Sequence, residues 1–429
     1  MLGLYKVVSK HSESRLNAFL QKRLERGKED AARIGEREGV ATMARPEGAL
    51  IWVHGASVGE AQSALILIKR LLERAHGKDV HVMITTGTMS SAGFLQDRLP
   101  EGCFHQFYPL DHPSWVAKFL DHWQPDAAIW MESELWPNML LAVQERNIPA
   151  VMVNARLSDT SFKRWKWLKG DIKKLLQSFD LILTQDGEAK ERYEKLGASS
   201  VQNIGNIKYS AVPLKKDDEA LSALRVAVGN RPLWVYASTH QGEEEIALQV
   251  HQVLKASLPD VLTVIVPRHV ERGEKIEDLI ADNGLTYTRR SYSDAVPGAS
   301  DDIYLADTMG ELGLFYRLAP IACIGRSLSD DGGGGHNPIE AAQLHCGVLH
   351  GPNIQYQRDF FAEMDAEGAA MQVDEAAHLA QVLERLLSDS DALQEFRDRA
   401  FGFTQSKGGV VEDVLGELTP ILQKAKVLG

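Results

Sequence analysis

The chain has 429 residues, which is more than one hydrophobic core usually supports, so its length predicts two domains. A formal net charge of −12 argues against broad binding to nucleic acids, and we expect no nucleic-acid partner. The three cysteines, Cys103, Cys323 and Cys346, form no CxxC pair. They are typical of reduced, buried residues, which argues against a domain held together by disulfides.

Residues 1–45 are locally basic, with ten Lys or Arg against six Asp or Glu. Charged residues such as Lys6 and Lys10 interrupt the apolar start well before the ~20 apolar residues that a membrane span needs. We therefore predict neither a span nor a signal peptide, but a basic amphipathic segment that contacts anionic lipid. A solvated terminal helix with mixed charges is the alternative.

Apolar runs of strand length alternate with segments of helical spacing along the rest of the chain. The runs lie at residues 49–53, 80–86, 104–110, 127–131, 150–154 and 181–185, and then at 233–238, 262–267, 303–306, 321–325 and 347–350. Continuous apolar strands that alternate with helices indicate parallel sheets covered on both faces. The predicted fold class is α/β, with two Rossmann-like, doubly wound parallel-sheet domains facing a central cleft. This is the GT-B architecture of many glycosyltransferases.

A polar stretch at residues 208–219 separates the two series of strands and predicts a linker. We place an N-terminal Rossmann-like, acceptor-binding domain at 46–210 and a C-terminal, donor-binding domain at 211–429. The last segment, 410–428, has helical spacing and can pack back across the domain boundary.

The first strand leads into the sequence HGASVGE at residues 54–60. Ser57 and Glu60 have the spacing of a capping box, in which each side chain satisfies a backbone N–H group of the helix start. Glu60 also follows the carboxyl end of a strand, where an α/β sheet binds its ligands, and it can take the proton from an attacking sugar hydroxyl. Helix capping and general-base catalysis are therefore the two alternatives for Glu60.

Two glutamates follow another strand in the sequence WMESELWPN at residues 130–138. One of Glu132 and Glu134 can bind hydroxyl groups of an acceptor, while the other caps the helix that Pro137 begins. A structural ion pair is the alternative for either residue.

The next strand leads to Arg156, and a segment that mixes basic and aromatic residues follows. Basic side chains bind phosphate or carboxylate, and tryptophan favours the membrane interface, so a phosphorylated lipid acceptor accounts for both features. A solvated helix face with core aromatics is the alternative. The predicted membrane-contact residues are Phe162, Lys163, Arg164, Trp165, Lys166 and Trp167.

In the second half, polar residues at three strand ends are of the kind that holds a donor's phosphate or carboxylate. These candidates are Ser238, Thr239 and Glu243, then Arg268 and His269, and then Met309, Gly310 and Glu311. Thr308 and Glu311 also have the spacing of a capping box.

A run of four glycines, which Gly335 closes, is the strongest single signal in the chain. Glycines let a backbone approach a ligand closely, while Asn337 fits an N-cap, Pro338 the first helical position and Glu340 the third. Glu340 either caps the helix or accepts two hydroxyl groups of a ribose, and the four glycines favour the ribose.

The sequence contains no HxxxH or HExxH spacing and no DxD pair in a convincing setting, so we expect no metal. It also lacks a Walker lysine motif and a GxGxxG fingerprint, which argues against ATP and NAD.

Eight blocks, taken in order, resemble the 3-deoxy-D-manno-octulosonic acid (Kdo) transferases of Gram-negative bacteria. The resemblance covers nearly all of the chain after Arg33. The blocks are HGASVGE, WMESELWPN, NARLS, GNIKYS, STHQGEEE, VPRH, MGEL and GGHNPIEAA.

The resemblance implies an inverting glycosyltransferase that moves Kdo from CMP-Kdo onto the lipid A precursor (lipid IVA) in lipopolysaccharide biosynthesis. It implies a place at the cytoplasmic face of the bacterial inner membrane and a reaction without a metal or other cofactor. Glu60 would be the general base, Ser57 and Gly59 would shape its turn, and the acceptor or Kdo unit would be flanked by Glu132, Glu134 and Arg156. The donor side would comprise Ser238, Thr239, Glu243, Arg268, His269, Met309, Gly310, Glu311, Gly335, Asn337 and Glu340.

Many relatives begin with a hydrophobic anchor, whereas the start of this chain is short and charged, so we expect peripheral attachment to the anionic inner-membrane surface. Two rival hypotheses remain. The first is another GT-B sugar transferase or epimerase with a different nucleotide-sugar donor. The second is a non-catalytic module that binds glycolipid or nucleotide.

Overall fold

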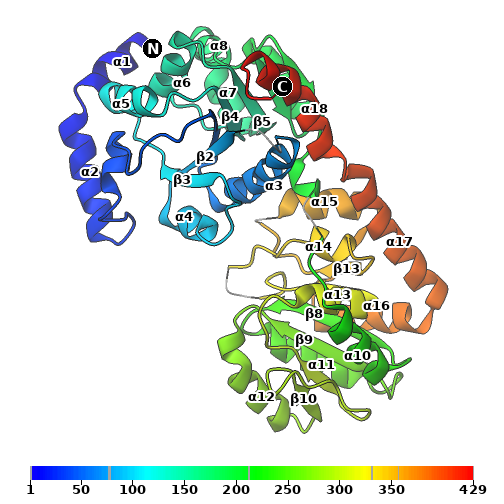
Figure 1. Ribbon diagram of the computed structural model, residues 1–429. Helices are drawn as coiled ribbons and strands as arrows, with labels where there is room; N and C mark the ends of the chain where they lie inside the picture. The colour runs from blue at the N-terminus through cyan, green and yellow to red at the C-terminus, as the bar shows by residue number, and fades with distance from the viewer. Residues whose placement is uncertain (1, 76–78, 211–212, 330–331, 356, 429) are drawn as a thin grey trace. The chain divides into compact units, whose positions relative to one another are not determined.

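The computed structural model describes residues 2–75, 79–210, 213–329, 332–355 and 357–428, and the chain forms two compact units (Figure 1). Unit 1 contains Met1–Ala211 together with Gly408–Gly429, and unit 2 contains Val212–Lys407. The chain therefore passes between the units twice. The domain prediction placed the C-terminal segment within 211–429 with the option of crossing back, and the structure assigns it to unit 1.

Unit 1 is built on a seven-stranded parallel sheet with the order β3-β2-β1-β4-β5-β6-β7. The order reverses between β1 and β4, the topological switch point at which α/β sheets bind their ligands. The strands are β1 (Ala49–His54), β2 (Val80–Thr86), β3 (Cys103–Phe107), β4 (Ala127–Met131), β5 (Ala150–Ala155), β6 (Leu181–Thr184) and β7 (Val201–Asn203).

Helices cover both faces of this sheet, because its strands are apolar on both sides. Along β1, Ile51 and Val53 belong to one buried cluster, whereas Leu50 and Trp52 belong to the other. The first cluster is completed by α3 (Val58–Arg74), α4 (Met89–Leu95) and α18 (Val410–Lys424). The second is completed by α5 (Pro113–Trp123), α6 (Pro137–Glu145), α8 (Lys169–Leu176) and α9 (Gly187–Leu196).

The basic segment at the N-terminus is fastened to unit 1 by polar contacts. It forms α1 (Leu2–Lys10), α2 (Glu13–Glu25) and the 3-10 helix η1 (Ile34–Glu38). The Tyr5 hydroxyl donates to the Asp111 carboxylate at 2.8 Å. The buried Glu36 carboxylate accepts from the Phe107 backbone N–H at 2.7 Å and from the Arg33 guanidinium. The segment therefore packs as part of the first unit.

Unit 2 repeats the architecture with a second seven-stranded parallel sheet in the order β10-β11-β9-β8-β12-β13-β14, whose order reverses between β8 and β12. Its strands are β8 (Leu233–Thr239), β9 (Leu262–Pro267), β10 (Tyr287–Arg289), β11 (Ile303–Leu305), β12 (Ile321–Ile324), β13 (Gly347–His350) and β14 (Ala370–Gln372). Its helices are α10 (Asp218–Val228), α11 (Glu243–Leu254), η3 (Val270–Arg272), α12 (Gly273–Asp282), α13 (Leu312–Leu318), α14 (Ile339–Ala342), α15 (Arg358–Ala366), α16 (Ala376–Ser388) and α17 (Ser390–Lys407).

The expected α/β fold class is confirmed, with three short strands added to the prediction. The strands β7, β10 and β14 have only three residues each and are partly exposed, so they lack the apolar run that marks the other strands. Each lies at the edge of a sheet. All three cysteines are free, and Cys323 and Cys346 are buried as predicted, whereas Cys103 is only partly buried at the start of β3.

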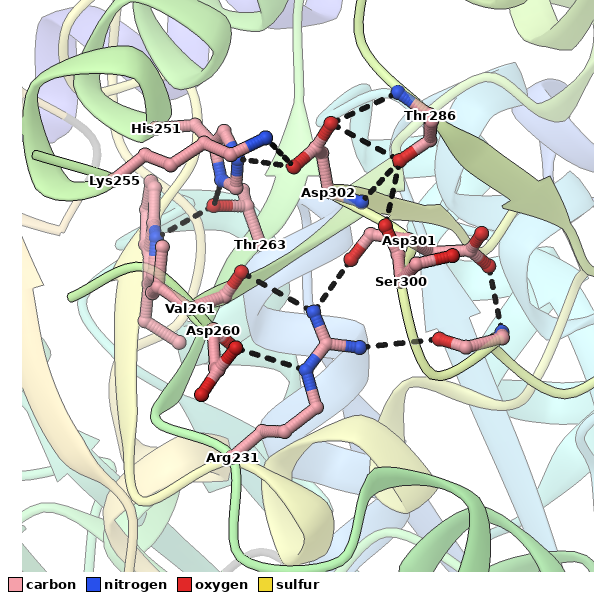
Figure 2. Close-up of polar contacts among 12 residues, drawn as sticks. Arg231, His251, Lys255, Asp260, Val261, Thr263, Thr286, Ser300, Asp301 and Asp302 are labelled. Carbon is pink, nitrogen blue, oxygen red and sulfur yellow. Dashed lines mark hydrogen bonds and ion pairs between the residues drawn. The ribbon is translucent and has the colours of Figure 1, made fainter.

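A network of polar contacts around Asp302 links α11 to β9 and to the segments just before β10 and β11 (Figure 2). The Asp302 carboxylate accepts from Lys255 Nζ at 2.5 Å and from the Thr286 N–H and hydroxyl groups at 3.0 Å. The buried His251 lies 3.4 Å from the same carboxylate and 2.9 Å from the Thr263 hydroxyl. Burial alone would raise the pKa of Asp302, but these donors and the Lys255 charge lower it to about 2. The ionised carboxylate therefore stabilises the fold.

We predict that Asp302→Asn lowers the free energy of unfolding at pH 7 by about 2 kcal/mol, since each pKa unit is worth about 1.4 kcal/mol. The contribution is present above the ordinary aspartate pKa and is lost as the pH falls towards about 2. The gap between wild type and variant in urea unfolding should thus narrow from pH 5 downwards. Asp260→Asn is the matched control, because only its backbone carbonyl joins the network. An equal loss in both variants would contradict the prediction.

Candidate functional site

In unit 1 the candidate catalytic residues gather at the switch point between β1 and β4. Glu60 lies in the first turn of α3, directly after β1. Glu132 and Glu134 follow β4, and Arg156 follows β5. Because the carboxyl ends of neighbouring parallel strands meet at one edge, residues that are 96 positions apart in the sequence come together here.

The capping geometry expected for Ser57 and Glu60 is present. Ser57 is the N-cap of α3, and its hydroxyl accepts from the Glu60 N–H at 3.3 Å. The Glu60 carboxylate in turn accepts from the Ser57 hydroxyl at 3.0 Å and from the Ala56 N–H at 2.6 Å. It thus reaches the residue before the N-cap, which the standard box does not. A side chain on Gly55 would lie 3.2 Å from the Glu60 Cβ, so the glycine leaves room for this turn.

The Glu60 carboxylate has the proton affinity of a general base. Burial is the largest cause and raises its pKa, the negative charges of Glu132 and Glu134 raise it further, and the hydrogen bonds from Ala56 and Ser57 oppose them. The resulting pKa is about 7. A carboxylate that titrates near neutral pH can both accept and release a proton under physiological conditions.

Glu132 pairs with a residue that the sequence analysis did not single out. Lys208 Nζ, in the 3-10 helix η2 (Ile207–Ser210), lies 3.2 Å from the Glu132 carboxylate. Glu132 itself has a φ of 58°, a left-handed conformation that is uncommon for a residue with a side chain and is often found at functional sites. Lys208 sits in the block GNIKYS, where no apolar pattern or strand end marked it.

Glu134, the second glutamate after β4, contacts other residues than Glu132 does. Its carboxylate accepts from Trp136 Nε1 at 2.8 Å and lies 3.5 Å from Nε2 of the buried His54. Burial acts to raise the pKa of Glu134, but the contacts with His54 and Trp136 lower it overall. The expectation that one of the two glutamates caps the next helix is wrong. Asp111 caps α6 instead, accepting from the Asn138 and Met139 N–H groups at 3.0 and 2.9 Å.

Arg156 and the basic aromatic segment lie beyond β5. The side chain of Arg156 is exposed, and its N–H donates to the Ser133 hydroxyl at 3.2 Å. In α7 (Asp159–Lys166), Phe162 and Trp165 pack against the core, whereas Trp167 is 90% exposed. The cations Lys163, Arg164 and Lys166 are exposed. The alternative of core aromatics thus applies to two of the three rings, and Trp167 remains a surface residue.

In unit 2 the end of β8 differs from the prediction. Thr239 is buried and donates to Glu244 at 2.7 Å. Glu243 is also buried, and its carboxylate accepts four backbone N–H groups at 2.7–3.1 Å, from His240, Arg326, Ser327 and Leu328. Both residues were predicted to contact the donor, but their polar atoms are turned inward. They fix the loops that follow β8 and β12, and Ser238, near the end of β8, has a φ of 61° and is half-buried.

Two further strand ends in unit 2 combine exposed and fixed groups. Arg268 and His269 are exposed after β9. Met309 is exposed, Gly310 has a φ of 81°, and Arg290 holds the Glu311 carboxylate with two bonds of 2.6 and 2.5 Å. Glu311 contacts Thr308 as expected, but α13 begins at Leu312, so Glu311 occupies the cap position and not the third helical position.

The glycine-rich loop leads into the short helix α14. Gly335 has a φ of 67°, and Asn337 accepts from the Ile339 N–H at 3.0 Å. The helix begins at Ile339, with Pro338 in the cap position, one residue later than predicted. Burial raises the pKa of Glu340, while Asn337 and the charge of Arg268 oppose the rise. The sequence analysis also overlooked His240 and His336, whose Nε2 atoms lie 3.0 Å apart beside this loop.

Two properties of the described residues bear on the predictions about metals and membranes. No group of three or more His, Cys, Asp or Glu side chains within the described ranges is arranged to hold a metal ion. The expectation of a metal-independent reaction stays a prediction. In the same part of the chain, every helix is too short or too polar to cross a membrane.

Comparison with known proteins agrees with this geometry. The family described as 3-deoxy-D-manno-octulosonic-acid transferase (kdotransferase) matches residues 32–211. A 3-deoxy-D-manno-octulosonic acid transferase of Rickettsia felis is 36% identical over 87% of this chain and 79% of its own. One from Haemophilus influenzae is 33% identical over 91% of this chain and 92% of its own.

Solved structures support the architecture. The UDP-GlcNAc 2-epimerase of Neisseria meningitidis, bound to UDP-GlcNAc, is similar with a TM-score of 0.54 over 87% of this chain and 100% of its own. At 14% identity, this likeness establishes the GT-B fold alone. The extent and level of sequence identity to the curated relatives go further, and the chain belongs to the Kdo transferase family of glycosyltransferases.

Proposed function

We propose that this protein transfers Kdo from CMP-Kdo to a hydroxyl group of the lipid A precursor, with inversion at the anomeric carbon. The observation that carries the proposal is the Glu60 carboxylate, which lies in the first turn of α3 with a pKa raised to about 7. Membership of the Kdo transferase family supports Kdo as the transferred sugar.

In the proposed reaction an acceptor hydroxyl attacks the anomeric carbon of Kdo from the face opposite the phosphate of CMP. The bond between the hydroxyl oxygen and that carbon forms while the bond to the phosphate oxygen breaks, and its electron pair leaves with CMP. Glu60 takes the hydroxyl proton, which requires the ionised carboxylate at the start of the step. Glu132, Glu134 and Arg156 are the proposed acceptor or Kdo contacts beside it.

The donor is assigned to unit 2. Arg268 offers a cationic group for the phosphate of CMP, His269 offers a ring N–H group, and the Gly310 turn offers backbone N–H groups. Glu340 and Asn337, at the start of α14, are the proposed ribose contacts, and the glycine-rich loop that Gly335 closes leads directly to them. The buried Glu243 fixes the segment after β12 by accepting the Arg326 and Ser327 N–H groups, and the buried Thr239 donates to Glu244.

The acceptor is a lipid, and the surface of unit 1 supports peripheral attachment to an anionic membrane. Leu4, Val7 and Val8 of α1 are exposed apolar residues among lysines. The Leu2 N–H donates to Asp171 at 3.3 Å, so the start of α1 lies against α8, the helix that follows the basic aromatic segment. We propose that α1 and the basic aromatic segment contact the cytoplasmic face of the inner membrane.

We predict that Glu60→Gln reduces the transfer rate about 100- to 10,000-fold, the usual contribution of a general base. Mass spectrometry of the lipid formed from CMP-Kdo and lipid A precursor measures the rate. Since a raised carboxyl pKa costs stability once the pH exceeds the ordinary glutamate value, this variant should be at least as stable as wild type at pH 8. Glu73→Gln, on the exposed side of the same helix, is the control. Wild-type turnover by Glu60→Gln would contradict the assignment.

We also predict that kcat/KM falls about tenfold for each pH unit below about 7, because protonation of Glu60 removes the base. A pH–rate profile between pH 5 and 9 measures this limb. A limb near the ordinary glutamate pKa would show that another group accepts the proton.

UDP-sugars supplied at the same concentration should give no product, and turnover with them would favour a different donor.

Membrane attachment gives a third prediction for this site. Trp167→Ala should weaken binding to vesicles of equal parts phosphatidylglycerol and phosphatidylcholine by about 10- to 150-fold, since burying a large apolar side chain is worth ~1.5–3 kcal/mol. Val226→Ala, an exposed apolar residue of unit 2, is the control. Vesicle sedimentation measures both variants. Unchanged binding by Trp167→Ala and by a chain lacking residues 1–20 would exclude this surface.

A further inference from the structure

Lys208 is placed directly over the turn that carries the catalytic glutamate. Its Nζ atom lies 3.2 Å from Glu132 Oε1 and 3.9 Å from the point where a side chain on Gly59 would begin. The ammonium group therefore lies beside the first turn of α3, next to the residue that precedes Glu60. Both partners of the ion pair are mostly buried, with side-chain exposures of 32% and 24%.

The backbone around Lys208 is fixed on both sides. The buried Ile207 donates its N–H to Asn154 Oδ1, at the end of β5, at 3.0 Å. Ser210 donates its hydroxyl to the Gly408 carbonyl at 2.9 Å and accepts from the Val411 N–H at 3.1 Å. The 3-10 helix η2 is thus clamped between the sheet and the start of α18, close to both points where the chain leaves and re-enters unit 1.

The helix α18 also braces α3. Its Glu412 accepts from Arg70 at 2.9 and 2.5 Å and from Arg74 at 2.7 Å. The helix that carries Glu60 and the short helix that carries Lys208 are therefore held against the same C-terminal helix. The position of the Lys208 backbone relative to the Glu60 turn is therefore set by packing, and the contact with Glu132 holds the ammonium group.

We propose that Lys208 is a positioning residue of the transfer reaction, which neutralises Glu132 and keeps Glu60 in its proton-accepting form. This inference rests on the proposed role of Glu60 as general base. It assigns a role to an ion pair that would otherwise count as structural.

The charges around Glu60 give the reason. Glu132 and Glu134 face it as anions, Lys208 is the cation beside Glu132, and His54 contacts Glu134. Glu134 has its own donors in Trp136 and His54. Loss of the Lys208 charge would leave Glu132 unpaired next to a buried carboxylate, and like charges at short range favour protonation. Glu60 would then hold a proton at a pH where it must accept one.

The test compares pH profiles of kcat/KM. Lys208→Met should move the acid limb to higher pH by about one unit, so that activity one unit below the wild-type limb falls about tenfold. Lys208→Arg, which keeps the charge, should leave the limb near its wild-type position. Glu132→Gln should move it to lower pH. Lys195→Met, which breaks a surface ion pair with Glu191 in α9, is the control.

Two outcomes would overturn the inference. One is an unmoved limb in Lys208→Met, and the other is an equal shift in Lys208→Met and Lys208→Arg, which would indicate loosened packing. If Lys208→Met does not fold, the double variant Glu132→Gln/Lys208→Met, which removes both charges of the pair, takes its place and should have its limb near that of wild type. A limb raised by about one pH unit in this double variant would reject the inference.

The experiments distinguish failure of the proposed function from failure of this inference alone. Wild-type turnover by Glu60→Gln would reject both the role of Glu60 as base and the role of Lys208. An inactive Glu60→Gln with an unmoved limb in Lys208→Met leaves the base in place and rejects Lys208 alone.

Discussion

The requirement to bury both faces of a parallel sheet governs where this protein can place chemistry. Strands such as β1 and β8 are apolar on both sides and are covered by helices, so polar side chains are excluded from most of their length. Polar groups are tolerated at the ends of the strands. At a switch point the following segments turn to opposite faces and leave the strand ends accessible, which is where the carboxylates of unit 1 collect.

Two glutamates in corresponding turns differ in their hydrogen-bond partners, and this difference sets which of them can exchange a proton. Glu60 follows the first strand of unit 1, and Glu243 follows the first strand of unit 2. Burial raises the pKa of both carboxyl groups. Glu243 is compensated by four backbone N–H groups, so its bonding capacity is spent inside the protein. Glu60 receives one N–H and one hydroxyl and faces two other carboxylates, which leaves it able to exchange a proton.

The sequence alone predicted the features that depend on local pattern. The long strands were recognisable from continuous apolar runs, and the turn at Glu60 from the spacing of Ser57 and Glu60. The short edge strands β7, β10 and β14 were missed because their residues are partly exposed. The capping of α6 by Asp111 was missed because the two segments are distant in the sequence and become neighbours only after folding.

Lys208 and Glu243 show, in opposite ways, where a local sequence pattern stops predicting the site. Lys208 carried no local signal, since its proposed importance comes from its contact with Glu132, 76 residues earlier. Glu243 carried a strong local signal, a glutamate at a helix start after a strand, yet its side chain turns inward to loops that follow β12. A motif fixes which residue types reach the edge of a sheet. The direction in which each side chain turns depends on non-local hydrogen-bond partners.

The likeness to a UDP-GlcNAc epimerase at 14% identity separates the demands on the fold from the demands on the reaction. The same pair of sheets supports a different chemistry in that enzyme, so the sheets do not specify the transferred sugar. Specificity must then reside in the edge residues, whose replacement leaves the apolar core unchanged. In this chain those residues are charged and crowded, and a cluster of three carboxylates is unfavourable unless counter-charges are built in. Lys208 supplies such a charge beside Glu132, while Glu134 lies 3.5 Å from Nε2 of His54, and the two partners come from different elements of unit 1. The raised pKa of the Glu60 carboxyl group is therefore a property of the assembled edge, which the HGASVGE turn alone would not reproduce.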